Sequence, residues 1–316
     1  MAIGLGLGAH KSQIQNDPSW IDGLVLWYDF SNETTMCIDR DGTTPVTANN
    51  DQVRWARNIA NGDANGNILG NFARSEAAGS QYGGIFKTGG INGQSYVQFA
   101  ETDSDNSHGL RSGFIAADAT DDGGVATNKF SDVALDVDNL TVIQILKHDD
   151  AVIEENDISL YINAYPAVGG DTNSCIYSSQ KAALDEKFST GYFFIAGGFD
   201  IEASVANDTL DTNVHAMVMR STSGTNNMTL QVDGVVQTDT DTPDNRTMKF
   251  DRSTGIPGSI GGAAFYSIGG SFQSGTMIKS WRGAIYETIV YNRFLSDDEL
   301  ASLEVYFTEK YGITFS

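Results

Sequence analysis

The C-terminal stretch from Trp281 to Phe315 constrains the fold more than any other part of the sequence. It opens with a near-continuous apolar run, Ala284–Tyr291, which is rich in Ile, Val, Thr and Tyr. The run is too short for a stable helix, and β-branched and aromatic residues favour strands. We therefore predict a strand at Ala284–Tyr291 that is buried on both faces.

A complete helix-start signal follows this strand. Ser296 is placed as the N-cap, and Glu299 three residues later completes a capping box. In a capping box the side chain of each residue accepts a hydrogen bond from the free backbone N–H of the other. Leu295 and Leu300 flank the cap as a hydrophobic staple, and Gly312 is a natural stop. Between cap and stop, apolar residues recur at helical spacing: Leu300, Leu303, Phe307 and Tyr311. The sequence therefore predicts a short C-terminal helix packed by its apolar face.

Upstream of this unit the chain contains many short apolar runs separated by Gly- and Asn-rich turns. Predicted strands lie at Leu24–Phe30, Ser95–Phe99, Leu140–Leu146, Ile158–Ile162, Gly191–Ala196, Val214–Met219, Met228–Val232, Val235–Gln237 and Ala264–Gly269. Asp233-Gly234 supplies the two positive-φ residues of a type I′ hairpin turn. No repeat and no change of composition marks a second domain, so this pattern predicts one all-β sandwich or barrel.

The charge of the chain excludes several classes of partner. Its 316 residues include 19 basic and 41 acidic side chains, which gives a net charge of −22. Such a surface repels phosphate backbones and anionic lipid head groups, so we predict no binding to nucleic acid or to membranes. The two cysteines, Cys37 and Cys175, are far apart in sequence and in no metal-type spacing, which favours two buried free thiols over a bridge.

The N-terminal segment 1–19 is predicted to be a flexible arm. Ile3, Leu5 and Leu7 alternate with glycines, a pattern suited to an extended docking peptide that adds to the sheet edge of a neighbour. A disordered terminus is the alternative. The segment carries no charged region before its apolar residues, so it does not read as a secretion signal.

Four stretches, in this order, resemble one known superfamily. They are LVLWYDFSN; VRWARNIANGDANGN with INGQSYVQF; VHAMVMRSTSGTNNMTLQVDGVVQT; and SIGG with WRGAIYETIVYNRFLSDDELASLEVYFTEKYGI. The chain is similar in them to the laminin-G-like, concanavalin A-like lectin/glucanase superfamily in its bacterial and phage form. The resemblance covers residues 20–316 and implies a jelly-roll sandwich of two antiparallel sheets with a short C-terminal helix. It says little about function, because the fold hosts lectins, hydrolases and structural modules.

Hydrolases of this superfamily carry carboxylates in an E-x-D-x-(x)-E pattern, with two carboxyls about 5 Å apart for a retaining mechanism. Glu155 and Asp157 supply the first two members, but Ser159 and Leu160 stand where the final acid belongs. No nucleophile elbow is present, and the four histidines are far apart in sequence. His215, at the position of the family's strand histidine, is expected to pack or hydrogen-bond beside the hairpin. We therefore predict that the chain is not an enzyme and has no catalytic residues.

Two kinds of ligand site remain candidates. Calcium is favoured over zinc because the available ligands are oxygens in polar loops, with Asp103, Asp105, Asp239 and Asp241 as candidate ligands. Solvated acidic turns are the alternative explanation of these residues. A sugar site needs an exposed aromatic side chain beside polar residues. Trp55, Tyr82 and Phe272 are its candidates, with core packing as the competing role for at least two of them.

Together these features lead to one hypothesis and two alternatives. The leading hypothesis is a non-enzymatic virion structural protein of a tailed bacteriophage, made in the host cytoplasm and attached to capsid or tail proteins. It would present a lectin-like sandwich to host surface glycans, and a homo-oligomer would suit such a component. The alternatives are a secreted or surface glycan-binding adhesin and a divergent glycoside hydrolase.

Overall fold

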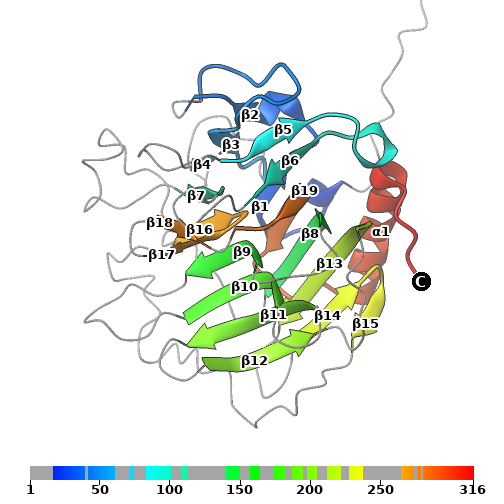
Figure 1. Cartoon of the computed structure of the whole chain (residues 1–316). Coiled ribbons are helices and arrows are strands. Elements are labelled where there is room, and N and C mark those ends of the chain that lie inside the picture. The colour runs from blue at the N-terminus through cyan, green and yellow to red at the C-terminus, as the bar shows by residue number, and fades with distance from the viewer. Residues whose placement is uncertain are drawn as a thin grey trace, which may run out of the picture.

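The computed structural model describes fifteen segments of the chain: residues 17–39, 42–60, 72–74, 83–100, 108–112, 140–149, 157–163, 174–181, 187–194, 198–204, 212–221, 228–237, 265–273, 276–278 and 280–316. Within these segments the chain forms two antiparallel β-sheets and one α-helix, α1 (Asp297–Tyr311), near the C-terminus (Figure 1). The predicted fold class, an all-β sandwich of two antiparallel sheets with a C-terminal helix, is confirmed.

The first sheet has eight strands and is organised around β19 (Gly283–Tyr291). Its order is β15 (Val235–Gln237), β14 (Met228–Val232), β13 (Val214–Ser221), β8 (Leu140–His148), β19, β6 (Tyr96–Phe99) and β5 (Ile85–Lys87), and β1 (Leu24–Asp29) also pairs with β19. β8 runs along one edge of β19. The other edge is shared, because β6 pairs with the first residues of β19 and β1 pairs with the rest.

The second sheet has nine strands and draws on most of the remaining chain. Its order is β12 (Gly198–Ser204), β11 (Lys187–Phe194), β10 (Ser174–Lys181), β9 (Asp157–Asn163), β16 (Phe265–Ile268), β7 (Leu110–Ser112), β4 (Phe72–Arg74), β3 (Trp55–Arg57) and β2 (Met36–Cys37). A separate two-stranded sheet pairs β17 (Ser271–Gln273) with β18 (Thr276–Ile278). The described residues also form three short 3₁₀ helices: η1 (Pro18–Trp20), η2 (Glu33–Thr35) and η3 (Ile91–Gly93).

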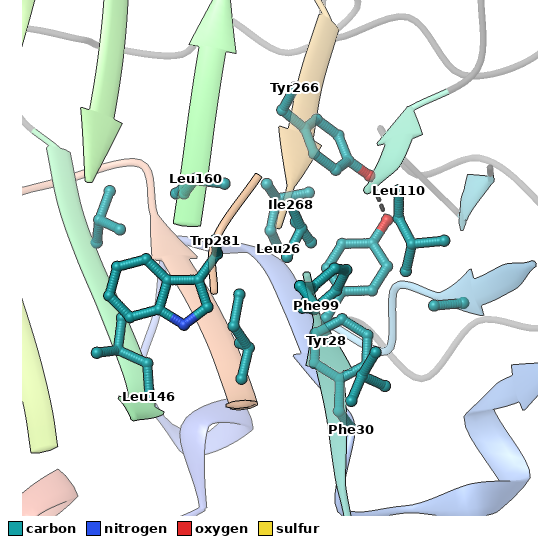
Figure 2. Packing of buried hydrophobic residues seen from close by; sticks show 14 of the residues in the cluster. Leu26, Tyr28, Phe30, Phe99, Leu110, Leu146, Leu160, Tyr266, Ile268 and Trp281 are labelled. Carbon is teal, nitrogen blue, oxygen red and sulfur yellow. Dashed lines mark hydrogen bonds between the residues drawn. The ribbon is translucent and has the colours of Figure 1, made fainter. Parts of the chain in front are cut away.

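The main hydrophobic core lies between the two sheets (Figure 2). Its largest fully buried side chains include Trp281, Tyr28 and Tyr266, and the hydroxyls of the two tyrosines hydrogen-bond to each other across the interior. Figure 2 shows this bond with Leu110, Leu160 and Ile268 from the nine-stranded sheet around it. A buried hydroxyl needs a hydrogen-bond partner, and here the hydroxyl of each tyrosine is the partner of the other. The sheets are therefore joined by apolar packing and by a polar contact.

A second core lies on the opposite face of the eight-stranded sheet, beneath α1 (Figure 1). Strand β8 serves both cores, since Val142 and Leu146 belong to the inner core while Ile143 and Ile145 belong to the outer one. This alternation follows from the two-residue period of a strand. A strand covered on both faces reads as an uninterrupted apolar run, which is why the sequence of β8 lacks an alternating pattern.

The ends of α1 are those that the sequence predicts. Ser296 and Glu299 form the capping box in both directions, and Gly312 ends the helix in the left-handed conformation with φ +72°. Leu295 and Leu300 are both buried in the outer core, as expected for the staple. The C-terminal strand and helix, predicted from local signals, are thus confirmed.

The predicted hairpin turn is also confirmed. Asp233 and Gly234 have φ values of +50° and +84° between β14 and β15. The Asp233 carboxylate accepts a hydrogen bond from the backbone N–H of Ala216 at 2.8 Å and lies 2.7 Å from Nδ1 of His215. His215 therefore hydrogen-bonds beside the hairpin, the role expected from its position in the sequence.

The N-terminal residues that the structure describes are attached to the eight-stranded sheet. Pro18 is buried in η1, and its carbonyl accepts a hydrogen bond from the Tyr291 hydroxyl at 2.9 Å. The arm residues Ile3, Leu5 and Leu7 lie outside the described segments, so their docking role stays a prediction. Cys37 is a buried free thiol, as predicted.

Candidate functional site

One row of residues crosses the whole nine-stranded sheet. Backbone register pairs each residue of the row with the next: Cys37, Trp55, Arg74, Arg111, Ser267, Tyr161, Tyr177, Gly191 and Glu202. We call this set the Trp55–Glu202 row. Every strand of the sheet contributes one residue to it, so segments distant in sequence meet along one line.

The row belongs to the outer face of the sheet, away from the eight-stranded sheet. Residues adjacent to it in sequence are members of the inner core, among them Ala56 beside Trp55, Leu110 beside Arg111 and Leu160 beside Tyr161. Because consecutive residues of a strand alternate between its faces, the row residues occupy the opposite face. Figure 2 shows Leu110, Leu160 and Ile268 on the inner side.

Trp55 begins the polar and aromatic part of the row and is only half-buried. The exposed Arg57, two residues further along β3, places its guanidinium carbon 5.8 Å from the centroid of the Trp55 ring. Gly42 approaches the ring so closely that a Cβ at that position would lie 2.6 Å from it. A glycine is needed there, both for this contact and for its φ of +69°. The indole is thus held in place by Gly42 and by an arginine.

The centre of the row combines two arginine positions with a serine. Arg74 of β4 and Arg111 of β7 are direct register partners, and Arg111 is in turn the partner of Ser267 in β16. Ser267 is fully buried, and its hydroxyl donates a hydrogen bond to the carbonyl of Gly270 at 2.6 Å. The outer face is therefore covered at Ser267, and this hydroxyl is not available to a ligand in the described structure.

The other half of the row adds two tyrosine positions and one carboxylate position. Tyr161 of β9 pairs with Tyr177 of β10, which pairs with Gly191 of β11, and Glu202 of β12 ends the row. Aromatic, basic and acidic residue types thus share one register line of the nine-stranded sheet. These are the groups with which proteins stack against and hydrogen-bond to polar ring-shaped ligands.

A second polar cluster lies in the interior, between the sheets. Asp157 Oδ2 lies 2.7 Å from Nε2 of His148 and accepts a hydrogen bond from Nε of Arg282 at 2.9 Å. Asp157 and His148 are fully buried, and the Trp281 ring meets the imidazole edge-on with a centroid separation of 5.1 Å. Asp157, the second acid of the incomplete carboxylate pattern, is therefore an interior pairing residue.

The structure places few of the sequence-predicted site residues together. Trp55 lies in the Trp55–Glu202 row, whereas Phe272 belongs to the separate β17–β18 hairpin, where its register partner is Met277. The remaining predicted ligands, Tyr82, Asp103, Asp105, Asp239 and Asp241, as well as Glu155, lie outside the described residues. Calcium binding by the four aspartates therefore stays a prediction.

Two observations on the described segments concern metals and membranes. No group of three or more His, Cys, Asp or Glu side chains in these segments is arranged to hold a metal ion. No helix in the same part of the chain combines the length and the apolar character required to cross a membrane.

Arg74, Arg111, Tyr161 and Tyr177 were not among the sequence-predicted site residues. β4 and β7 are three residues long and are flanked in the sequence by glycine or polar residues, so their sequences show no periodic pattern of apolar residues. Their juxtaposition depends on register between strands that are distant in sequence. The pattern that could have drawn attention to them is an arginine beside a small or apolar residue within a short run, which is too common to be selective.

Comparison with known sequences gives no family. No protein-family model matches the chain, and no curated protein matches it.

Comparison with solved structures gives distant matches. A Trypanosoma rangeli sialidase in complex with sialic acid matches with a TM-score of 0.46 and 13% identity, over 94% of this chain and 34% of the sialidase. The CBM40 of a Ruminococcus gnavus IT-sialidase, bound to α2,3-sialyllactose, matches with a TM-score of 0.38 and 15% identity, over 53% of this chain and 82% of that domain. The chain thus spans about a third of the length of the sialidase, and at these identities the likeness concerns the β architecture alone.

One prediction is corrected by these matches. From the sequence we predicted that the chain is not an enzyme, but the sialidases among the similar structures are enzymes. The prediction rested on the incomplete E-x-D-x-(x)-E pattern. The absence of this pattern excludes only one known arrangement of catalytic carboxylates. We therefore withdraw the assignment to a non-enzymatic class.

Proposed function

We propose that the chain is a carbohydrate-binding β-sandwich that holds a glycan across the outer face of its nine-stranded sheet. The observation that carries this proposal is the Trp55–Glu202 row. It aligns the following residues at consecutive register positions: Trp55, Arg74, Arg111, Ser267, Tyr161, Tyr177, Gly191 and Glu202.

The composition of the row suits a sugar chain. A pyranose ring has apolar C–H faces that pack against aromatic rings, and hydroxyl groups around its rim that need donors and acceptors. From Trp55 to Tyr177 the row crosses five strand-to-strand steps. At about 4.8 Å per step this is roughly 24 Å, and because Ser267 near its middle is fully buried, a sugar would meet the row on either side of that position.

A sheet is also a suitable support for such a site. Sites built on strands keep their geometry better than sites built on loops, because ladder hydrogen bonds fix the backbone on both sides. The half-buried Trp55 illustrates this, since Gly42 and Arg57 hold its ring in place. A preformed platform binds a flexible sugar chain with less loss of protein entropy.

Binding to a glycan array, followed by calorimetric titration of the bound sugars, tests the proposal. Trp55→Ala should weaken binding roughly 3- to 10-fold, because ring contacts contribute on the order of 1 kcal/mol. Trp20→Ala is the matched control, since Trp20 is 70% exposed on η1 beside the other sheet. If no glycan binds, or if both variants bind as the wild type does, the proposal is wrong. Reducing-end assays on the same mixtures would report whether the glycan is also cleaved.

The location of the protein is a further part of this proposal. The superfamily resemblance supports display outside the host cell, either on a tailed-phage particle bound to capsid or tail proteins or on a bacterial surface. Mass spectrometry of density-banded phage particles from the source culture distinguishes these locations. Stoichiometric presence relative to the major capsid protein supports the virion, and absence from the particles excludes it.

A further inference from the structure

We infer that a buried proton fastens α1 to the eight-stranded sheet, and that α1 leaves the sheet locally when this proton is lost. The residues involved are Glu287 on β19, Asp29 on β1 and Lys310 on α1, which we call the Glu287 cluster. The inference is independent of glycan binding, because the cluster lies beneath α1 and not on the nine-stranded sheet.

The Glu287 cluster combines two carboxylates with one ammonium group. Asp29 and Glu287 are direct register partners in the β1–β19 pair, so the two carboxylates share one site. Nζ of Lys310 lies 2.9 Å from Oδ2 of Asp29 and 3.4 Å from Oε2 of Glu287, and all three residues are buried. With all three groups ionised, the cluster holds one uncompensated negative charge, which is costly in the interior. One additional proton removes this charge.

Hydrogen bonds to Glu287 join the C-terminal half of α1 to the sheet. The hydroxyl of Tyr311 donates to Oε2 of Glu287 at 2.8 Å, and the hydroxyl of Tyr306 donates to Oε1 at 2.9 Å. The indole N–H of Trp27 on β1 donates to the same Oε1. Nζ of Lys310 also donates to the Tyr306 hydroxyl at 2.8 Å. The polar attachment of this half of the helix therefore depends on the state of one carboxyl group.

The surroundings do not supply a second cation to the cluster in the described part of the chain. β8 faces it with Ile143 and Ile145, and the nearby lysine of that strand, Lys147, is partly exposed. Arg293 is paired with Glu299 at the start of α1. The remaining ionisable groups that act on this region are acidic or phenolic: Asp17 before η1, Tyr286 and Tyr291 on β19. The negative charge of the ionised cluster is therefore not balanced from outside.

The pKa shifts have the direction that this charge count requires. Burial raises the pKa of Glu287 above 4.5 and Asp29 adds to the rise, whereas Lys310 and hydrogen bonds from Tyr311 and Trp27 oppose it. Burial lowers the pKa of Lys310, but the two carboxylates outweigh burial and hold it above 10.5. The closed state thus binds protons more tightly than the open state. Opening should therefore become easier as the pH rises from 4.5 through the folded pKa of Glu287.

The helix can leave without breaking either sheet. α1 takes no part in the strand pairing, and β19 keeps its backbone partners β8 along one edge and β6 and β1 along the other. Departure of α1 would uncover the apolar outer core, including Ile143, Ile145 and Ile289. The Glu287 cluster is therefore a pH-dependent switch between a covered and an uncovered face of the eight-stranded sheet.

Hydrogen exchange of the full chain, measured by mass spectrometry between about pH 4 and pH 8, tests this inference. Amides of α1 report departure of the helix, and amides of β8 report unfolding of the sheet. After correction for the intrinsic exchange rate at each pH, α1 should be less protected than β8 throughout. Above pH 4.5 its protection should fall by up to about tenfold per pH unit, because opening releases one proton.

Three variants assign the proton to the cluster. Glu287→Gln should abolish the pH dependence of α1 protection, since glutamine does not titrate. Asp29→Asn should reduce it, because Lys310 then balances Glu287 alone and the pKa of Glu287 falls. Glu309→Gln is the matched control: it removes a negative charge from an exposed position of the same helix and should leave the pH dependence unchanged. Circular dichroism verifies that the variants fold.

The wild-type measurement is decisive even if a variant fails to fold. Equal protection of α1 and β8 at every pH would mean that the helix leaves only when the sandwich unfolds, which overturns the inference. Protection of α1 that does not change with pH, or that rises with pH, overturns the role of the proton. The same pH dependence in wild type and folded Glu287→Gln protein overturns the assignment to Glu287.

Discussion

Nε2 of His148 lies 2.7 Å from Oδ2 of Asp157, and this fully buried pair links the eight-stranded sheet to the nine-stranded sheet. Arg282 joins the same carboxylate oxygen from the segment before β19 at 2.9 Å. A carboxylate that sequence patterns present as a candidate acid thus connects two sheets and a loop. Asp157 is therefore important for the stability of the fold.

Replacing Asp157 by Asn should destabilise the fold by about 3–5 kcal/mol. The neutral amide cannot balance the charge of Arg282, and breaking a buried pair from one side leaves the other side without compensation. Urea unfolding followed by circular dichroism measures the loss. Asp149→Asn is the matched control at an exposed position, with an expected change within about 0.5 kcal/mol. Equal stability of the two variants would show that the pair is not important.

Glu287 should contribute a part of the stability that declines as the pH rises. Its carboxylate is fully buried beneath α1, and four side chains donate to it: Trp27, Tyr306, Tyr311 and Lys310. Burial, together with the nearby Asp29, raises the pKa of Glu287 above its usual 4.5, although Lys310 and two of the hydrogen bonds oppose this. A raised pKa means that the folded protein holds the proton more tightly than the unfolded chain does.

The pH dependence of Glu287→Gln tests this relationship. The contribution of Glu287 should be fully present below about pH 4.5 and decline as the pH rises through its folded pKa. Because glutamine does not titrate, the stability of the wild type relative to the variant should decrease from pH 4 to pH 8. Unfolding free energies measured at several pH values provide the comparison. A constant or increasing difference would contradict the direction of the shift.

Two serines of the C-terminal region should respond in opposite directions to the same substitution. Ser296→Ala removes the N-cap oxygen that accepts from Glu299 N–H and should cost about 1 kcal/mol. Ser302 lies inside α1, where its hydroxyl donates to the Asp298 carbonyl. Ser302→Ala should therefore stabilise the protein by up to about 0.5 kcal/mol, since alanine is the better helix former. Thermal unfolding resolves the two signs, and a shared sign would refute the capping argument.

The packing of α1 on the sheet predicts a large difference between two neighbouring positions. Leu303 is 1% exposed in the outer core, whereas Val305 on the same helix is 47% exposed. Leu303→Ala should cost about 2–5 kcal/mol through lost contacts and the cavity left behind, and Val305→Ala should change stability little. Denaturant titration of both variants measures this. A small loss for Leu303→Ala would mean that the helix is not firmly packed on β8 and β19.

Sequence reasoning succeeded where the determinants of structure are local. The capping box at Ser296, the stop at Gly312 and the turn at Asp233 each depend on a few adjacent residues, and all three have the predicted conformation. The long buried strands were equally predictable, because β8 and β19 read as uninterrupted apolar runs. In these places the chemistry of a short stretch is enough to determine its backbone.

Sequence patterns do not predict which face a residue occupies where a β-bulge interrupts a strand, or which residues pair where the register between distant strands determines it. In β19 an irregularity between Ile285 and Glu287 breaks the alternation, so Tyr286 joins the outer core and Glu287 also faces α1. No pattern in the sequence predicts this irregularity. The arginine pair has the same origin, since only the pairing of β4 with β7 brings Arg74 opposite Arg111.

The position of β1 in the sheet has a consequence for biosynthesis. Trp27 and Glu287, which hydrogen-bond across the β1–β19 pair, are separated by 260 residues. At about 5–20 residues per second, a ribosome needs roughly 13–50 s to deliver β19 after β1 has emerged. During that interval β1 lacks β19, the strand with which it pairs. Its apolar residues must then be shielded from water by other parts of the nascent chain or by chaperones. A chain released before β19 and α1 would leave β1 without its partner strand and exposed to aggregation.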